Sequence, residues 1–277
     1  MGKRKILLPK KDLYNLYWIR NKSPYFIGKI YNCSFSTVTN RLREYRIPKK
    51  SKSKAQTKYK KFNFSKNLTE KAYLIGFRLG DLNVYRTSPN AETIIVRTHT
   101  TSKNQTLLIK NLFGKYGHVT VSGPEGGDVN INCFLDQSFS FLLPKYTNIE
   151  TWIQRNSIFF TAFVAGYVDA EGSFGINQGR ARFKMDSYDK NILHQIHYWL
   201  TKKMINSKLR LIGKKGELRP VGYRFNNDLW RLNVNEAQSL IKFISIIEPF
   251  VKHKKRIKDM KRAFNNIKIR KRKGTIL

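Results

Sequence analysis

Two acidic residues occupy matching places in two similar apolar stretches of the sequence. Asp81 closes the stretch that begins at Leu74, and Glu171 closes the one that begins at Val164, so 171 − 81 = 90 residues separate them. A single acid at the end of a helix is commonly a capping or surface residue. Two carboxylates brought together by paired helices would repel each other unless hard cations such as Mg²⁺ lay between them. The pairing therefore predicts a site for divalent metal ions.

Small residues in both stretches predict that the two helices pack closely. Gly76 and Gly166 lack side chains, and Gly80 and Ala170 lie about one turn further along. Glycine allows two backbones to approach where larger side chains would clash. The larger neighbours would pack into each half, and these are Leu74, Phe77, Leu79, Val164, Tyr167 and Val168.

The same series of elements follows each stretch. After the first come strands at 83–86 and 93–100, a helix at 105–116, and strands at 119–122 and 129–134. After the second come 173–177, 180–186, a helix at 190–202, and strands at 209–212 and 229–234. The order α-β-β-α-β-β thus occurs twice, which predicts an α+β fold of two pseudo-symmetric halves, 67–150 and 151–267.

The nine-residue segments LIGFRLGDL (74–82) and VAGYVDAEG (164–172) resemble the two motif copies of single-chain LAGLIDADG homing endonucleases. The stretch 172–176 is similar to the family's exit from helix to strand, and 247–251 with Lys254 and Lys255 is similar to its C-terminal segment. The resemblance covers about 68–264. Leu82 departs from it, because the motif has glycine there, so the exit into the first strand is expected to differ.

This resemblance implies αββαββα halves whose antiparallel, saddle-shaped sheets lie in the DNA major groove. It implies a monomeric, site-specific double-strand endonuclease that makes a staggered cut at a long, partly asymmetric target. Asp81 and Glu171, with the backbone carbonyls of Gly80 and Ala170, would hold two or three Mg²⁺ ions, for which Mn²⁺ or Ca²⁺ could substitute. Supporting basic residues are sought on the strands, where the candidates are Lys184, Arg231 and Arg97.

Strand alternation indicates which side chains face DNA. In 180–186, Ala181, Phe183 and Met185 would face the helices, while in 94–99 Ile94, Val96 and Thr98 would do so. Arginine pairs with guanine and asparagine with adenine in the major groove. The predicted DNA-facing side chains are Tyr85, Arg97, His99, Ser173, Asn177, Arg180, Arg182, Lys184 and Asp186.

The N-terminal residues 1–48 predict three short helices, with Ser23-Pro24 opening the second and Ser36 opening the third. The segment 34–48 resembles the helix-turn-helix domains of resolvases and prokaryotic regulators. That resemblance makes the third helix a recognition helix and places at DNA the side chains of Ser36, Thr37, Thr39, Asn40 and Arg43. A basic helical cap packed on the rest of the chain is the alternative.

Charge supports a nucleic-acid partner, since 54 Lys and Arg against 18 Asp and Glu give a formal net charge of +36. The stretch 49–66 predicts a basic linker, and 268–277 predicts a basic tail that is either disordered or contacts phosphates. Two distant cysteines, Cys33 and Cys133, favour a reducing compartment. With no apolar run of membrane-spanning length, we expect a soluble protein in a prokaryotic or phage-infected cytoplasm or a DNA-containing organelle.

Two other readings stay open at this stage. A non-cleaving DNA-binding regulator or an RNA intron maturase would use the same fold and the same basic faces. A homodimeric nuclease would need only one motif in each chain, and this sequence has two.

Overall fold

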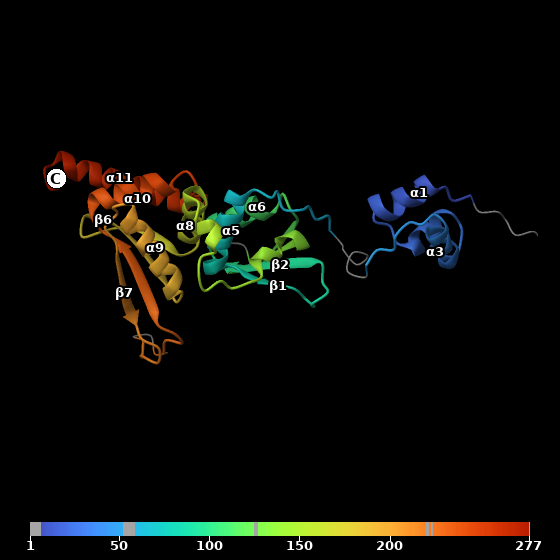
Figure 1. The fold of residues 1–277 in the computed structure, drawn as a ribbon, viewed down its shortest axis with the longest axis horizontal. Coiled ribbons are helices and arrows are strands. Elements are labelled where there is room, and N and C mark those ends of the chain that lie inside the picture. The colour runs from blue at the N-terminus through green and yellow to red at the C-terminus, as the bar shows by residue number, and fades with distance from the viewer. Residues whose placement is uncertain (1–6, 52–58, 125–126, 220–221, 223, 277) are drawn as a thin grey trace, which may run out of the picture. The chain divides into compact units, whose positions relative to one another are not determined.

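The computed structural model describes residues 7–51, 59–124, 127–219, 222 and 224–276 (Figure 1). The chain divides into two compact units, one of residues 1–60 with 88–92 and one of residues 61–87 with 93–277. Each unit has its own hydrophobic core. No helix among the described residues combines the length and apolar character needed to cross a membrane.

The smaller unit contains the three predicted helices. They are α1 (Lys10–Tyr14), which continues as the π-helix η1 (Asn15–Ile19), α2 (Pro24–Ile30) and α3 (Phe35–Glu44). Ser23 accepts a hydrogen bond from the Phe26 N–H (3.2 Å), which caps α2 before its proline. Ser34 caps α3 in the same way through the Thr37 N–H (3.1 Å), so this helix begins before the expected Ser36.

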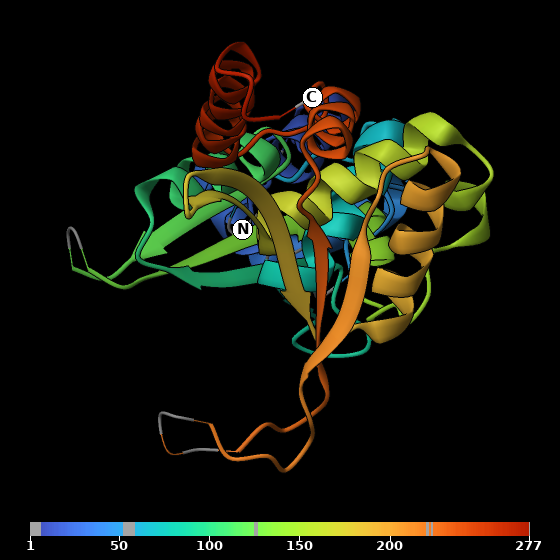
Figure 2. The ribbon, with the colours of Figure 1, turned by 90° about the vertical axis from the view of Figure 1, so that its left-hand side faces the viewer.

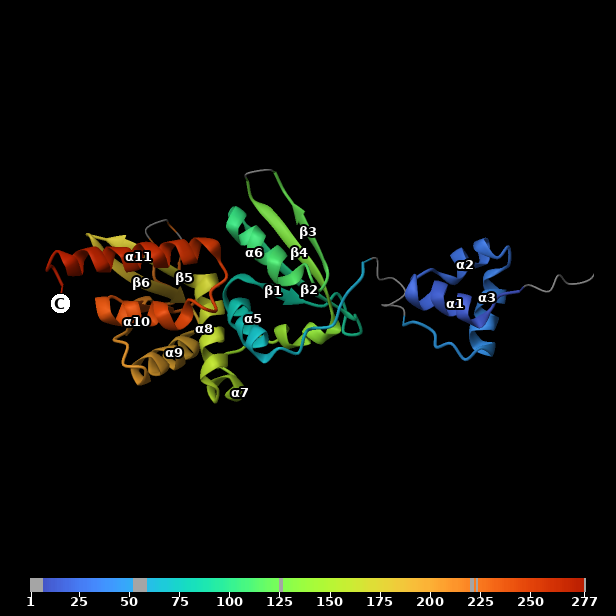
Figure 3. The same ribbon diagram turned by 90° about the horizontal axis from the view of Figure 1, so that it is seen from above.

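The first half of the larger unit runs α5 (Leu68–Asp81), β1 (Asn83–Tyr85), β2 (Thr93–Thr100), α6 (Lys103–Phe113), β3 (His118–Ser122) and β4 (Val129–Asp136). Its antiparallel sheet has the order β1-β2-β4-β3. A 3₁₀ helix, η2 (Gln137–Leu142), closes this half where the resemblance implied an α-helix. α6 lies along β3 and β4 (Figure 3).

The second half repeats this plan. After α7 (Thr151–Gln154) it runs α8 (Ser157–Glu171), β5 (Gly172–Asn177), β6 (Arg180–Ser187), α9 (Lys190–Lys202), β7 (Lys208–Gly213), β8 (Leu229–Val234) and α10 (Ala237–Ile247). The sheet order β5-β6-β8-β7 matches the first half strand for strand. The prediction of an α+β fold with two similar halves and two antiparallel sheets is confirmed.

α5 and α8 form the joint between the halves, as predicted. All eleven residues of α8 from Phe160 to Ala170 are buried, which is expected of a helix that is apolar on every side. A Cβ added at Gly76 would lie 2.1 Å from the Phe163 carbonyl oxygen, and one at Gly166 would lie 2.1 Å from the Tyr73 carbonyl oxygen. Each helix therefore presents a glycine to a backbone carbonyl of the other.

The C-terminal region consists of α10 and α11 (Lys254–Arg272), separated at Pro249. α11 extends past residue 267, so the predicted basic tail at 268–277 is wrong for its first five residues, which are helical. Buried Met260, Ala263 and Ile267 anchor this helix and explain why the cationic end stays ordered in helical form.

The predicted linker at 49–66 ends too late. The Phe62 N–H donates to the Tyr116 carbonyl (2.8 Å), and buried Phe64 packs against Phe139 and Tyr116. Residues 61–66 therefore belong to the larger unit, because these aromatic side chains enter its core. The part of the predicted linker at 52–58 lies outside the described residues.

Candidate active site and nucleic-acid interface

Asp81 and Glu171 lie close to each other where α5 and α8 end. A Cβ at Gly80 would lie 2.5 Å from the Ala170 Cβ and 2.9 Å from both Cγ and Oε1 of Glu171. Only a residue without a side chain fits beside the partner helix at this point. The two small residues that the sequence singled out thus bring Glu171 next to the residue that precedes Asp81.

Burial and mutual repulsion make this pair costly to ionise. Burial raises the pKa of Asp81 from 3.8 to about 6, against lowering effects of Gln105 and Arg256. Burial, followed by the charges of Asp81 and Asp189, raises the pKa of Glu171 from 4.5 to about 7. A divalent cation between the two carboxylates would offset the cost of ionising them.

Gln105, on the first turn of α6, holds Asp81 in place. Its Nε2 donates to Asp81 Oδ2 at 2.6 Å, and the Gln105 side chain is buried. Within the described residues, no hydrogen-bond donor contacts the Glu171 carboxylate. Sequence reasoning missed Gln105, since its helix was expected to begin there and no spacing linked it to Asp81.

Arg256, in the first turn of α11, is a second residue that the sequence did not indicate. Its positive charge acts to lower the pKa values of Asp81, Asp169 and Glu171. Its Nε is buried and has no hydrogen-bond partner among the described residues. The resemblance noted at Lys254 and Lys255 was the nearest available signal.

Buried Asp169 positions the start of α11. Its Oδ2 accepts hydrogen bonds from the Tyr73 hydroxyl of α5 (2.7 Å) and from the N–H groups of Lys252 (2.7 Å) and His253 (3.1 Å). His253 then caps α11, with Nδ1 accepting from the Lys255 N–H (3.2 Å). One carboxylate thus joins both motif helices to the helix that carries Arg256.

The departure at Leu82 changes the hydrogen bonding of the helix exit but not its backbone direction. Leu82 (φ −106°, ψ 132°) and Gly172 (φ −72°, ψ 150°) are both extended, but the Gly172 N–H donates to the Val168 carbonyl and begins β5, whereas among the described residues Leu82 makes no such bond and β1 begins one residue later. At Gly172 a Cβ would lie 2.7 Å from the Val168 carbonyl oxygen. In the first half Arg78 replaces that valine, and its buried guanidinium donates to the carbonyls of Leu142 (3.1 Å) and Leu82.

The candidate basic residues fall into two classes. Arg97 is the cross-strand neighbour of Asn83 between β1 and β2, and Lys184 is that of Ser173 between β5 and β6. Asn83 lies two positions after Asp81, and Ser173 lies two positions after Glu171. The two are therefore equivalent in the two halves. Arg231 differs, because its Nε and Nη2 bind both oxygens of Asp186 at 2.6 Å.

The second sheet presents a basic hollow of about 510 Å³ on its helix-free face. Ala181, Phe183 and Met185 are buried, as predicted, and the hollow is lined by Ser173, Asn177, Arg182, Lys184, Lys208, Arg210, Arg231 and Asn233, among others. In the first sheet Ile94, Val96 and Thr98 are buried, while Arg97 and His99 are exposed and Tyr85 is half-buried. The outward placement of Arg97, His99, Arg180 and Lys184 agrees with their exposure, whereas Ile95 on the same side of β2 is buried. The DNA contacts stay predictions.

In α3, Ser36, Asn40 and Arg43 are exposed, and of these the Ser36 hydroxyl hydrogen-bonds to Ser34 Oγ (2.7 Å). Thr37 and Thr39 are half-buried and engaged locally, Thr37 Oγ1 with Ser34 Oγ (2.9 Å) and Thr39 Oγ1 with the Ser36 carbonyl (2.9 Å). The five predicted recognition residues therefore differ in availability.

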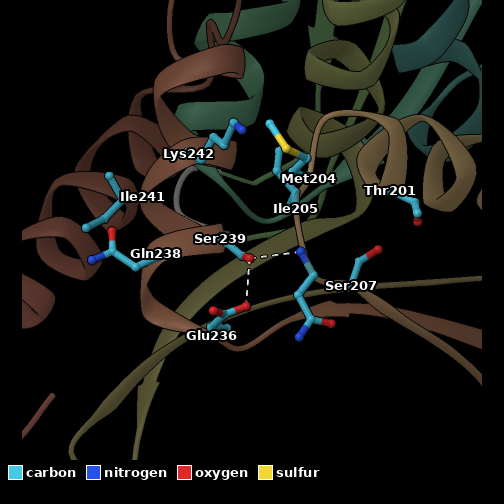
Figure 4. A pocket seen from close by; sticks show the side chains of 10 residues that line it. Thr201, Met204, Ile205, Ser207, Glu236, Gln238, Ser239, Ile241 and Lys242 are labelled. Carbon is cyan, nitrogen blue, oxygen red and sulfur yellow. Dashed lines mark hydrogen bonds between the residues drawn. The ribbon is translucent and has the colours of Figure 1, made fainter. Parts of the chain in front are cut away.

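A hollow of about 660 Å³ opens where α9 ends and α10 begins (Figure 4). Ser239 Oγ there accepts from the Asn206 N–H (2.8 Å) and donates to Glu236 (2.9 Å), so these polar groups serve the local structure. Neither motif carboxylate lines this hollow.

Comparison with known proteins bears on the second half most directly. A sequence profile described as a LAGLIDADG-like domain matches residues 159–248. An uncharacterized protein of Methanocaldococcus jannaschii is 24% identical over 238 residues, which are 81% of this chain and 86% of the relative. The chain thus contains a region similar to a LAGLIDADG-like domain.

Solved structures of similar fold include the homing endonuclease I-DmoI in complex with DNA and Mn, with 18% identity and a TM-score of 0.45 over 68% of this chain and 99% of that one. Full-length DUF199/WhiA from Thermatoga maritima has 15% identity and a TM-score of 0.47 over 75% of this chain and 62% of that one.

Proposed function

We propose that this chain is a divalent-metal-dependent endonuclease that hydrolyses phosphodiesters in duplex DNA and acts as a monomer. The observation that carries the proposal is the meeting of Asp81 and Glu171 at the ends of two closely packed helices, with both pKa values raised. Perturbed carboxylates held together in this way are typical of a catalytic site. The similarity of the second half to a LAGLIDADG-like domain agrees with it.

The residues at this site fit divalent metal ions. The two carboxylates provide hard oxygen ligands, and the Asp81 charge acts to raise the pKa of Glu171, so a bound cation would relieve their repulsion. Gly80 and Ala170 each directly precede one of these acids in the sequence. Asp81 and Glu171 would hold the ions, with the carbonyls of Gly80 and Ala170 as additional ligands. When bound, such ions lower the pKa of a water molecule and stabilise the charge of the departing oxygen.

The chain's own residues would orient the reactants. Gln105 fixes one oxygen of Asp81 and leaves the other available to a ligand. Arg256 supplies a positive charge near the carboxylates that can face a phosphate oxygen. Lys184 and Arg97, each opposite the strand that leaves its acid, are placed to support one half each.

The helix-free faces of the two sheets would bind the duplex. The hollow of the second sheet contains five cationic side chains, Arg182, Lys184, Lys208, Arg210 and Arg231. Phosphate contacts hold a protein in register on DNA, and the Arg and Asn side chains among them can read bases. The exposed residues of α3 would add affinity and length of site.

A plasmid library that carries a randomised duplex segment tests this function. We expect Mg²⁺-dependent linearisation by the wild-type chain, and its loss in Asp81→Asn and Glu171→Gln with DNA binding retained. Glu248→Gln, at an exposed acid after α10, is the matched control and should cleave normally. Binding without any metal-dependent cleavage by the wild-type chain would contradict the endonuclease proposal and favour a DNA-binding regulator.

A further inference from the structure

A row of exposed cations runs along α11 and has no role in the proposed active site. Buried Met260, Ala263 and Ile267 define the inner face of this helix. The outer face carries residues spaced by three, four or seven positions, which places them on one side of an α-helix. We call them the α11 row: Lys254, Lys258, Lys261, Lys268 and Arg272, all exposed.

Nothing within the part of the chain that the structure describes neutralises the α11 row. The one acid of this helix, Asp259, is largely buried and pairs with Lys255 (3.1 Å) and Arg262 (3.8 Å), which are not members of the row. The five row side chains make no ion pair or hydrogen bond with described residues. Their charge is therefore available to a partner.

The charge pattern also opposes the stability of the helix itself. Like charges four positions apart, such as Lys254 with Lys258 and Lys268 with Arg272, repel each other. The first turn has no acid and begins with two lysines, although the positive end of the helix dipole favours anions there. A bound polyanion would relieve both effects.

α11 is held rigidly beside the proposed DNA-binding sheet. Asn266 Oδ1 accepts from the Ala181 N–H (3.0 Å), and its Nδ2 donates to the Gly179 carbonyl (3.1 Å). Figure 2 shows α11, in dark red, next to the β5–β6 hairpin that these bonds clamp. The row is thus preorganised relative to the strands.

We propose that the α11 row binds the sugar-phosphate backbone of duplex DNA beyond the segment covered by the sheets, a proposal that rests on the proposed function. The helix begins at the carboxylates, where Arg256 lies, and runs away from them for 19 residues, which is about 28 Å. That length matches about eight phosphates of one strand at roughly 3.4 Å of rise each. An extended polyanion of regular charge spacing is the partner that a straight, rigid row of this kind fits.

Salt-dependent binding tests this interaction with mixed-sequence duplexes of two lengths. The variant Lys258→Gln/Lys261→Gln/Lys268→Gln should reduce the slope of log K against log salt by about 2.7, at roughly 0.9 per lost phosphate contact. It should also lose the preference of the wild-type chain for the longer duplex. The matched control is Lys110→Gln/Lys145→Gln/Lys202→Gln, at exposed lysines outside α11, and it should change the slope by less than about 1.

The proposal is overturned if the triple variant of the α11 row shows the same salt slope as the control variant. It is also overturned if the row variant keeps its affinity for duplex DNA and loses affinity for a folded RNA. Circular dichroism should show that both triple variants are folded. Cleavage is measured separately, because a chain that binds through the row without cutting DNA would refute the endonuclease and leave the row intact.

Discussion

Replacing Gly166 by alanine tests the glycine–carbonyl joint between α5 and α8. The new Cβ would lie 2.1 Å from the Tyr73 carbonyl oxygen, and real Cβ contacts essentially never fall below 3.0 Å, so the backbones must separate by at least 3.0 − 2.1 = 0.9 Å. Because both contacting groups are backbone atoms, no side chain can rotate away. Overpacking of this kind should lower the free energy of unfolding by about 3 kcal/mol, at the upper end of the usual range.

The same displacement would reach the active site, since Gly80 and Glu171 lie further along the same two helices. A misplacement of about 1 Å can lower a catalytic rate by about 100-fold. Urea unfolding followed by tryptophan fluorescence measures the first effect, and plasmid cleavage measures the second. Trp152, Trp199 and Trp230 report on the larger unit.

Gly175→Ala is the control for stability, because no atom lies within 4 Å of its added Cβ. It should change the free energy of unfolding by less than about 0.5 kcal/mol. If Gly166→Ala is as stable as this control, the close approach of the two helices is not a constraint on the fold, and our account of the joint is refuted.

Two further predictions concern buried carboxylates. The pKa of Glu171 is about 7 in the folded chain against 4.5 in the unfolded one, so its stabilising contribution is complete below pH 4.5 and is lost as pH rises through 7. Without metal, Glu171→Gln should therefore raise the free energy of unfolding at pH 8 by roughly 2 kcal/mol and make it depend less on pH. An unchanged pH dependence of unfolding would contradict this. Asp169→Ala should destabilise the larger unit by about 3 kcal/mol, because it leaves three donors without their acceptor, two of them buried. Asp169→Asn keeps an acceptor and should recover most of that loss in urea unfolding. Equal losses in the two variants would show that the hydrogen bonds do not hold α11.

The periodic parts of the fold could be predicted from sequence. The alternation at 180–186 gave the strand faces correctly, and that at 94–99 did so except at Ile95, which is buried on the outward side. The repeated glycines identified the joint, because such patterns report directly on burial. Gln105 and Arg256 could not be found in this way. They reach the acids from separate helices, and nothing in local spacing shows which helix will end beside another.

Sequence analysis also missed residues whose effect depends on a contact with a second residue. Leu82 alone suggested an altered exit, but the structure pairs this change with Arg78, whose guanidinium takes up the Leu82 carbonyl. The end of α11 was predicted as a tail because six consecutive residues include five cations, and the buried anchors Met260 and Ile267 lie upstream of them. Tertiary contacts decided both cases.

The mutual fit of Gly76 to the Phe163 carbonyl and of Gly166 to the Tyr73 carbonyl has a consequence for recombination. Each half supplies one glycine and the backbone carbonyl that packs against the glycine of the other half. A chimaera that exchanges one half for that of a relative should assemble only where both matches survive, however similar the sheets are. Libraries of chimaeras built from such halves should therefore take residues 72–80 and 162–170 from the same parent protein.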